Sequence, residues 1–211
     1  SFDKKPLASA SVSQVHRAVL KSGKKVVVKV QRPNLREIMD TDLDILFHIA
    51  HALEKHFPNL NNYHPVDVVK EFALWTRKEL NFEIEGRNAA ALREKLKNNH
   101  QVIIPKIYPA FSSKRVLTME YINGVKINDF AALEKYHINR KALVMTYFTS
   151  ILEQALLHGL FHADPHPANI FVQKNGKLAY LDYGIVGELN PGDRKKVIRF
   201  ITSVNDKDPT K

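Results

Sequence analysis

The chain has 211 residues, 44% of them hydrophobic and none of them cysteine, which suits one domain with a sizeable core and excludes disulfides and thiolate chemistry. It contains neither a signal-peptide pattern nor an apolar run of about 18 residues, so we expect no transmembrane segment in this chain. Its net charge is +10, but the basic residues are scattered and not interleaved with aromatics, so a solvated surface is favoured over nucleic-acid binding.

Residues 6–19 and 26–30 are predicted to form a β-hairpin around a glycine-containing turn. The first strand starts with small residues and could be an ordinary edge strand, but it also fits the template of a kinase glycine-rich loop. The three glycine positions and the valine of that template fall on Ala8, Ala10, Ser13 and Val15. Small residues let backbone N–H groups approach phosphates, and alanine lacks the conformational freedom of glycine, so we expect a stiff loop.

Lys29 lies in a strand that is otherwise all valine. A lysine flanked by apolar β-branched residues is costly to bury unless a carboxylate or a phosphate pairs with it. We therefore interpret Lys29 as a phosphate-binding lysine in preference to an exposed edge residue. Its carboxylate partner is expected on the second of the two helices that follow, where spacing alone leaves four candidates: Glu71, Glu79, Glu83 and Glu85.

Two long helices are predicted next, the first over residues 33–57 and the second from Pro65 to about Lys97. Strands are then predicted over 102–111 and 115–122. In a two-lobed kinase the segment after the second strand is the hinge, whose backbone hydrogen-bonds the adenine edge. By order alone the gate residue and the hinge are Met119 and then Glu120, Tyr121 and Ile122.

A helix over 139–159 is predicted to end at Gly159 and to lead into the stretch that contains Asp164. Farther on, two apolar runs flank an Asn-Gly pair, the strongest short signal for a tight hairpin. Such a hairpin brings its two ends together, so we expect Asn169 and Asp182 to lie side by side and next to Asp164. Their oxygen atoms would suit Mg²⁺.

The order and spacing of Asp164, Asn169 and Asp182-Tyr183-Gly184 match the catalytic Asp, the metal-binding Asn and the metal-binding Asp-x-Gly of kinase-type phosphoryl transfer. After Gly184 there is almost no activation segment, which argues against a peptide substrate. A different interpretation takes His162, Asp164 and His166 as a transition-metal site. It is less favoured because prolines frame a loop there and His166 better fits a structural hydrogen bond.

Four stretches in order resemble the UbiB/ADCK family of atypical kinases, the group tied to coenzyme Q biosynthesis, and the match covers essentially the whole chain. These stretches are 6–18, the family's Ala-rich loop, and 28–33, 79–89 and 162–169. The resemblance implies that Lys29 pairs with Glu85, that Asp164 is catalytic, and that Asn169 and Asp182 hold Mg²⁺. It implies nucleotide contacts at Ala8, Ser9, Ala10, Ser11, Ser13, Val15, Val27, Lys29, Met119, Glu120, Tyr121 and Ile122.

The sequence departs from the family pattern at two of these sites. Glu79 and Asn81 fall on the family's Glu-x-Asp motif, with Asn81 in place of the Asp, and Val27 replaces the usual alanine before the lysine. An amide at Asn81 would weaken an ion pair or accessory metal contact, and Val27 would crowd the adenine pocket. Family members also carry an N-terminal helical extension, which we expect to lie outside this chain together with a C-terminal remainder.

We therefore predict an α+β, two-lobed protein-kinase-like fold in a single domain. A small antiparallel-sheet N-lobe to about residue 121 would carry the inserted helical pair, and a mainly helical C-lobe would follow. The predicted function is an atypical kinase or ATPase that binds Mg-ATP or ADP and hydrolyses ATP or phosphorylates a small or lipid-like acceptor in quinone biosynthesis. The alternative is a nucleotide-sensing scaffold without useful turnover. Expected partners are an anionic membrane surface or quinone-biosynthesis proteins, in the cytoplasm or, in a eukaryote, the mitochondrion.

Overall fold

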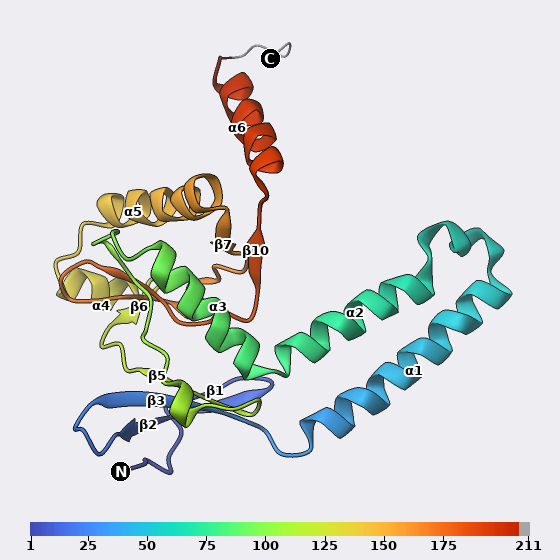
Figure 1. Cartoon of the computed structure of the whole chain (residues 1–211), viewed down its shortest axis with the longest axis horizontal. Helices are drawn as coiled ribbons and strands as arrows, with labels where there is room; N and C mark the ends of the chain where they lie inside the picture. The colour runs from blue at the N-terminus through green and yellow to red at the C-terminus, as the bar shows by residue number, and fades with distance from the viewer. Residues whose placement is uncertain (207–211) are drawn as a thin grey trace. The chain divides into compact units, whose positions relative to one another are not determined.

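The computed structural model describes residues 1–206. They form two compact units, and each unit draws on two separate stretches of the chain. The first unit comprises Ser1–Ile84 and Tyr108–Met119, and the second comprises Glu85–Ile107 and the chain from Glu120 onward. Figure 1 shows both units, with labels on those helices and strands that have room for one.

The first unit contains a four-stranded sheet in the order β1-β2-β3-β5. Its strands are β1 (Ala8–Ser9), β2 (Ser13–Val19), β3 (Lys25–Gln31) and β5 (Val116–Glu120). β2 and β3 pair antiparallel over their whole length, from Ser13 opposite Gln31 to Val19 opposite Lys25. The predicted hairpin is confirmed, and Gly23 takes the left-handed conformation (φ +80°) at its turn.

Two helices follow β3 and pack against each other as a hairpin (Figure 1). They are α1 (Leu35–His56) and α2 (Pro65–Glu79), joined by the 3₁₀ helix η1 (Pro58–Tyr63). Their buried residues are Leu35, Leu43 and Ala50 on α1 and Val66, Ala73 and Thr76 on α2. Other apolar residues of α1 stay in contact with solvent, such as Ile38 and Ile49 at 53% and 51% exposure. The predicted helical pair is confirmed, although its apolar pattern is broader than its buried face.

The second long helix predicted from the sequence is wrong in its extent, because the chain forms α2 and then a separate helix, α3 (Phe82–Lys95). Residues distant in sequence occupy the backbone groups at the break. The Leu80 carbonyl accepts a hydrogen bond from the Gln31 side chain at 3.0 Å, and the Phe82 N–H donates to the Lys114 carbonyl at 3.0 Å. These tertiary bonds replace helical ones, so the helix ends where local propensity would continue it.

The second unit contains a four-stranded sheet in the order β4-β9-β8-β6 and a two-stranded pair, β10-β7. The strands are β4 (Val102–Ile103), β6 (Val125–Lys126), β7 (Leu160–His162), β8 (Ile170–Val172), β9 (Leu178–Tyr180) and β10 (Val186–Glu188). The strand predicted over 102–111 is much shorter than expected. Pro105 and Pro109 lack the N–H that a ladder needs, and Pro109–Phe111 forms the 3₁₀ helix η2 instead.

The second unit also contains several helices. They are the C-terminal part of α3, α4 (Phe130–Lys135), α5 (Arg140–Leu152), the π-helix η3 (Glu153–His158) and α6 (Pro191–Asp206). Of these, α5 contacts β9 of the four-stranded sheet and α6 contacts the π-helix. The core of the unit consists of Ala89, Leu92, Leu96, Val102, Ile104, Leu133, Leu143, Ile170, Val172, Leu178, Tyr180 and Tyr183. The predicted C-cap at Gly159 is confirmed, since this glycine has φ +68° directly after the π-helix.

Candidate functional site

The β8–β9 hairpin holds the two ends of the candidate metal site together. Ile170 pairs with Tyr180, and one further bond, from the Leu181 N–H to the Asn169 carbonyl at 2.9 Å, continues the ladder beyond the strands. The turn contains Gly176 in the left-handed conformation (φ +83°), at the glycine of the predicted Asn-Gly pair. The hairpin is therefore confirmed, and it places the backbone of Asn169 beside the residue that precedes Asp182.

Asp164 lies in the loop between β7 and the 3₁₀ helix η4 (Pro167–Asn169), with an exposed side chain. Its backbone N–H donates to His162 Nδ1 at 3.2 Å, and its carbonyl accepts from the His166 N–H at 2.8 Å. Neither bond involves the Asp164 carboxylate. The loop is thus fixed by its backbone.

His166 makes a local hydrogen bond, as its Nδ1 accepts from the Ala168 N–H at 3.2 Å and caps the 3₁₀ helix. Within residues 1–206, no three His, Cys, Asp or Glu side chains lie close enough together to hold a metal ion. The transition-metal interpretation of His162, Asp164 and His166 therefore finds no support in the structure.

His162 is buried at 3% exposure at the start of the loop that carries Asp164, with the Tyr180 and Tyr183 rings 5.5 and 5.9 Å away. Burial lowers the pKa of His162, and the Asp182 and Asp164 carboxylates oppose this shift only in part. A neutral ring that accepts a hydrogen bond at Nδ1 carries its proton on Nε2. The imidazole therefore acts as an uncharged support for the Asp164 backbone.

The π-helix places a second buried polar group, Gln154, next to the backbone of His162. Gln154, 1% exposed, accepts a hydrogen bond from the His162 N–H through its Oε1 at 3.0 Å. One turn earlier, the Ser150 hydroxyl contacts the Tyr180 hydroxyl at 2.6 Å, and burial raises the pKa of Tyr180 to about 12. No sequence motif marks Gln154, so the sequence analysis missed it. A π-helix, which often occurs at functional sites, is the structural signal.

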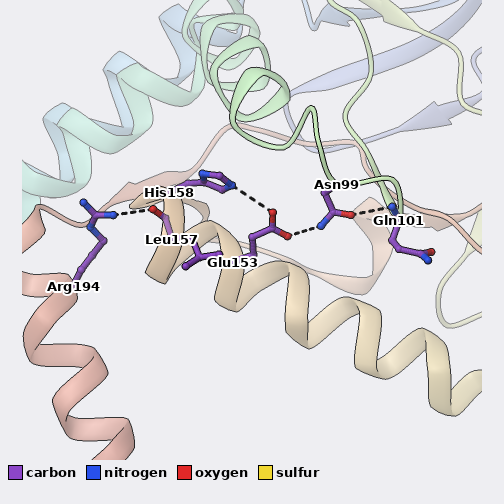
Figure 2. A network of polar contacts seen from close by, with 6 residues as sticks. All are labelled: Asn99, Gln101, Glu153, Leu157, His158 and Arg194. Carbon is purple, nitrogen blue, oxygen red and sulfur yellow. Dashed lines mark hydrogen bonds and ion pairs between the residues drawn. The ribbon is translucent and has the colours of Figure 1, made fainter.

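Residues at both ends of the π-helix take part in an extended polar network (Figure 2). Glu153 accepts from the Asn99 side chain at 2.5 Å and lies 3.4 Å from His158 Nε2. Arg194 of α6 donates to the Leu157 carbonyl at 2.9 Å. These contacts fix the π-helix between the loop after α3 and the start of α6, so Gln154 is held from both sides.

The Asp182-Tyr183-Gly184 segment is also tied down locally. Asp182 Oδ1 accepts from the Gly184 N–H at 2.9 Å, and Asn88 of α3 donates to the Tyr183 carbonyl at 2.9 Å. Tyr183 is fully buried, and burial together with the Glu85 and Asp182 carboxylates raises its pKa well above the usual value. α3 is thus bonded directly to the segment that carries the second candidate metal ligand, through Asn88.

Burial separates the four carboxylate candidates that the sequence left for Lys29. Glu71, Glu79 and Glu83 are exposed, whereas Glu85 is only 4% exposed. A buried carboxylate is costly unless it has a partner. Lys29 belongs to the first unit, where it is partly buried and its ammonium lies 5.1 Å from the centre of the Phe82 ring. Glu85 is thus the buried one of the four candidates, and its pairing with Lys29 stays a prediction.

The candidate phosphate loop is a hairpin of its own in the first unit. Ala8 pairs with Val15, and Val15 pairs in turn with Lys29, so the three lie in one row across β1, β2 and β3. The turn closes with the Ala10 N–H donating to the Ser13 carbonyl at 2.8 Å. The row places the loop beside the candidate phosphate-binding lysine. The exposed residues of the loop are Ala8, Ser9, Ala10 and Ser11.

The predicted hinge residues differ in their surroundings. Met119 is buried at the end of β5, at 4% exposure, and Ile122 is buried at 7%. The Glu120 N–H donates to the Lys106 carbonyl at 2.8 Å, while its carboxylate accepts from the Lys106 N–H at 3.1 Å. Tyr121 is partly buried. The backbone donor of Glu120 is therefore already used within the chain.

The two departures from the family pattern have clear structural surroundings. Asn81 Oδ1 accepts from the Glu83 N–H at 3.1 Å and so caps the start of α3, a role that an aspartate would fill equally well. Glu79 ends α2 and is exposed. Val27 is partly buried and lies opposite Arg17 in the β2–β3 ladder.

A lysine strand followed by an Asp loop, an Asn and an Asp-x-Gly at the end of a hairpin defines a protein-kinase-like fold, as predicted. The structure resembles that of Rv3197 from Mycobacterium tuberculosis in complex with erythromycin, with a TM-score of 0.75 and 27% identity over 92% of this chain and 48% of that one. It also resembles a Rio2 kinase–ADP/Mg²⁺–phosphoaspartate complex from Chaetomium thermophilum, with a TM-score of 0.54 over 96% of this chain and 53% of that one. At 15% identity, the second likeness shows the fold alone.

The chain belongs to the ABC1 atypical kinase-like domain family, whose model matches residues 1–211. It is 39% identical to Protein ACTIVITY OF BC1 COMPLEX KINASE 7, chloroplastic, of Arabidopsis thaliana, over 100% of this chain and 30% of the relative. It is also 39% identical to Probable protein kinase UbiB of Marinobacter nauticus, over 94% of this chain and 37% of the relative. The predicted family is confirmed. The chain spans about a third of the length of these relatives.

Proposed function

We propose that the chain is the nucleotide-binding part of an atypical kinase or ATPase that acts on Mg-ATP or ADP. The observation that carries the proposal is the β8–β9 hairpin, which joins the Asn169 and Asp182 ends through the bond from Leu181 to Asn169. In this proposal Asp164 orients the acceptor or water, and Lys29 binds the phosphates with Glu85 as its partner. Catalysis would rest mainly on positioning and electrostatics.

The donor set of the hairpin fits Mg²⁺. An amide oxygen from Asn169 and a carboxylate from Asp182 are hard oxygen ligands, and Mg²⁺ commonly completes such a pair with phosphate oxygens and water. Bound there, Mg²⁺ would neutralise charge that develops on the transferred phosphoryl group. The chain itself contributes the fixed loop: Gly184 holds one Asp182 oxygen, and Asn88 holds the Tyr183 carbonyl.

A small or lipid-like acceptor is favoured over a peptide by the segment that follows Gly184. β10 begins at Val186 and pairs directly with β7, with Val186 opposite His162 and Glu188 opposite Leu160. α6 begins at Pro191, so the segment is too short to form a peptide-docking loop. We propose quinone biosynthesis as the process, by analogy with the family, and an anionic membrane surface or quinone-biosynthesis proteins as partners.

The location is proposed from the relatives in the same way. The names of two Arabidopsis relatives place those proteins in the chloroplast, and another relative is bacterial. We propose the bacterial cytoplasm or a eukaryotic organelle for this chain. No helix within residues 1–206 has the length and apolar character needed to cross a membrane.

A nucleotide-sensing scaffold without useful turnover is the second candidate. The observation that favours it is the alanine-containing loop, in which no residue takes a positive φ and whose turn is closed by a backbone hydrogen bond. A loop of this kind would bind nucleotide without closing tightly around a triphosphate.

Asp182→Ala separates the two candidates. For an enzyme, Mg²⁺-dependent ATP turnover should fall by about 100-fold or more, because several kcal/mol of transition-state stabilisation depend on the metal. Asp67→Ala is a suitable control, since Asp67 is an exposed carboxylate on α2 whose ion pair with Lys70 lies on the same helix. Equal ATP turnover in wild type and Asp182→Ala would reject the proposal that the chain is an enzyme and leave the nucleotide-sensing scaffold as the remaining candidate.

A further inference from the structure

Arg32 contacts both sides of the candidate phosphate loop, residues 8–13. Its Nε and Nη2 atoms donate to the Ala10 carbonyl at 3.2 and 3.1 Å. Its backbone N–H donates to the Val12 carbonyl at 3.0 Å. One residue thus makes three hydrogen bonds to two carbonyls at the tip of the loop.

The position of Arg32 follows from the sheet register. Ser13, the last residue of the loop, lies opposite Gln31, so the next residue of the chain reaches the loop tip. Pro33 follows, and a residue before proline is biased towards an extended backbone, which continues the direction of β3. The planar guanidinium then brings two donors to one carbonyl with a fixed geometry.

The loop tip also has donors that are not used within the chain. The N–H groups of Ser11 and Val12 have no hydrogen-bond acceptor in the part of the chain that the structure describes. Successive backbone N–H groups in a turn form a concave site for anions such as phosphate oxygens. The bonds from Arg32 to Ala10 and Val12 hold the carbonyls on either side of Ser11.

We propose that Arg32 is a positioning residue that locks the loop in a conformation ready to bind the phosphates of a nucleotide. This inference rests on the proposed function, because it assigns the loop to that nucleotide. A loop that is already ordered loses less conformational entropy when a ligand binds, so the lock increases nucleotide affinity. Arg32 acts through Ala10 and Val12 and touches no reacting atom.

Hydrogen exchange of the nucleotide-free protein tests whether Arg32 orders the loop in the absence of a ligand. We expect Arg32→Met to speed exchange in the peptide over residues 7–15 roughly tenfold, the scale of one lost hydrogen bond to a charged group. Lys25→Met is the matched control, because Lys25 is an exposed cation at the other end of the same strand, and its exchange pattern should equal that of wild type. Unchanged loop exchange in Arg32→Met would overturn the proposal.

Calorimetric titration with Mg-ADP tests the consequence. We expect the Kd to rise roughly tenfold in Arg32→Met and to stay at the wild-type value in Lys25→Met. Arg32→Lys keeps the charge but not the two-pronged geometry, so it should restore only part of the affinity. Full affinity in Arg32→Lys, with a loop that still exchanges fast, would show that charge alone binds the nucleotide and would overturn the positioning role.

The two experiments also distinguish this proposal from the proposed function. If wild type binds no nucleotide, the proposed function fails and the positioning role fails with it, while the exchange data still show whether Arg32 locks the loop. If wild type binds Mg-ADP and Arg32→Met binds it equally well, the positioning role alone is rejected.

Discussion

Asp164→Asn should lower ATP turnover by about 100-fold or more and leave nucleotide affinity within about twofold, the range expected when a positioned acid–base group is lost. The substitution removes the charge and keeps the shape. The fold should be unaffected, because the loop bonds of Asp164 to His162 and His166 involve only its backbone. Turnover and calorimetric titration of the same preparation provide the two measurements.

Asp129→Asn is the matched control for that substitution. The Asp129 carboxylate accepts from the Ala132 N–H at 3.1 Å as the N-cap of α4, and asparagine caps helices equally well. Turnover of Asp129→Asn should equal that of wild type. If Asp164→Asn also turns over at the wild-type rate, Asp164 does not orient the acceptor, and the assignment from the sequence is wrong.

Gly159→Ala should lower the free energy of unfolding by about 3 kcal/mol, more than most single substitutions. Gly159 has φ +68°, a conformation that costs other residues about 1 to 2 kcal/mol. A Cβ there would also lie 2.7 Å from the Leu189 carbonyl oxygen and 3.3 Å from the Arg194 side chain. Neither neighbour moves freely, since the Leu189 N–H donates to the Gly159 carbonyl and Arg194 donates to Leu157.

Gly176→Ala separates the clash from the backbone cost. Gly176 has φ +83°, but a Cβ there would meet only Ile138 Cδ1 at 3.9 Å, an ordinary contact. Urea unfolding should therefore show a loss of only about 1 to 2 kcal/mol in Gly176→Ala. Equal losses in the two variants would mean that Leu189 and Arg194 move aside for the added methyl group and that the clash costs little stability.

The sequence predicted those elements whose signals are local. The Asn-Gly pair led to the β8–β9 hairpin, and Gly159 ended the helical run before β7. Each signal depends on the conformational preference of one or two residues, which the rest of the fold leaves unchanged.

The sequence analysis failed where distant residues decide the structure. The break between α2 and α3 depends on hydrogen bonds from Gln31 and to Lys114, and no pattern within the helices shows them. The same holds for Gln154 and Asn88, which hold the backbone of His162 and of Tyr183 through single tertiary bonds. Burial, a property of the fold, also distinguished Glu85 from the other candidates for Lys29.

Nucleotide binding through Lys29 and Mg²⁺ is best tested by thermal unfolding with ADP or ATP, with and without Mg²⁺. Ligands that bind the native state raise its apparent stability by mass action. We expect a Mg²⁺-dependent rise in Tm for wild type and for Lys25→Ala, a neighbour on the same strand, and none for Lys29→Ala. No rise with any nucleotide in wild type, or an equal rise in Lys29→Ala, would show that the chain does not bind nucleotide in this way.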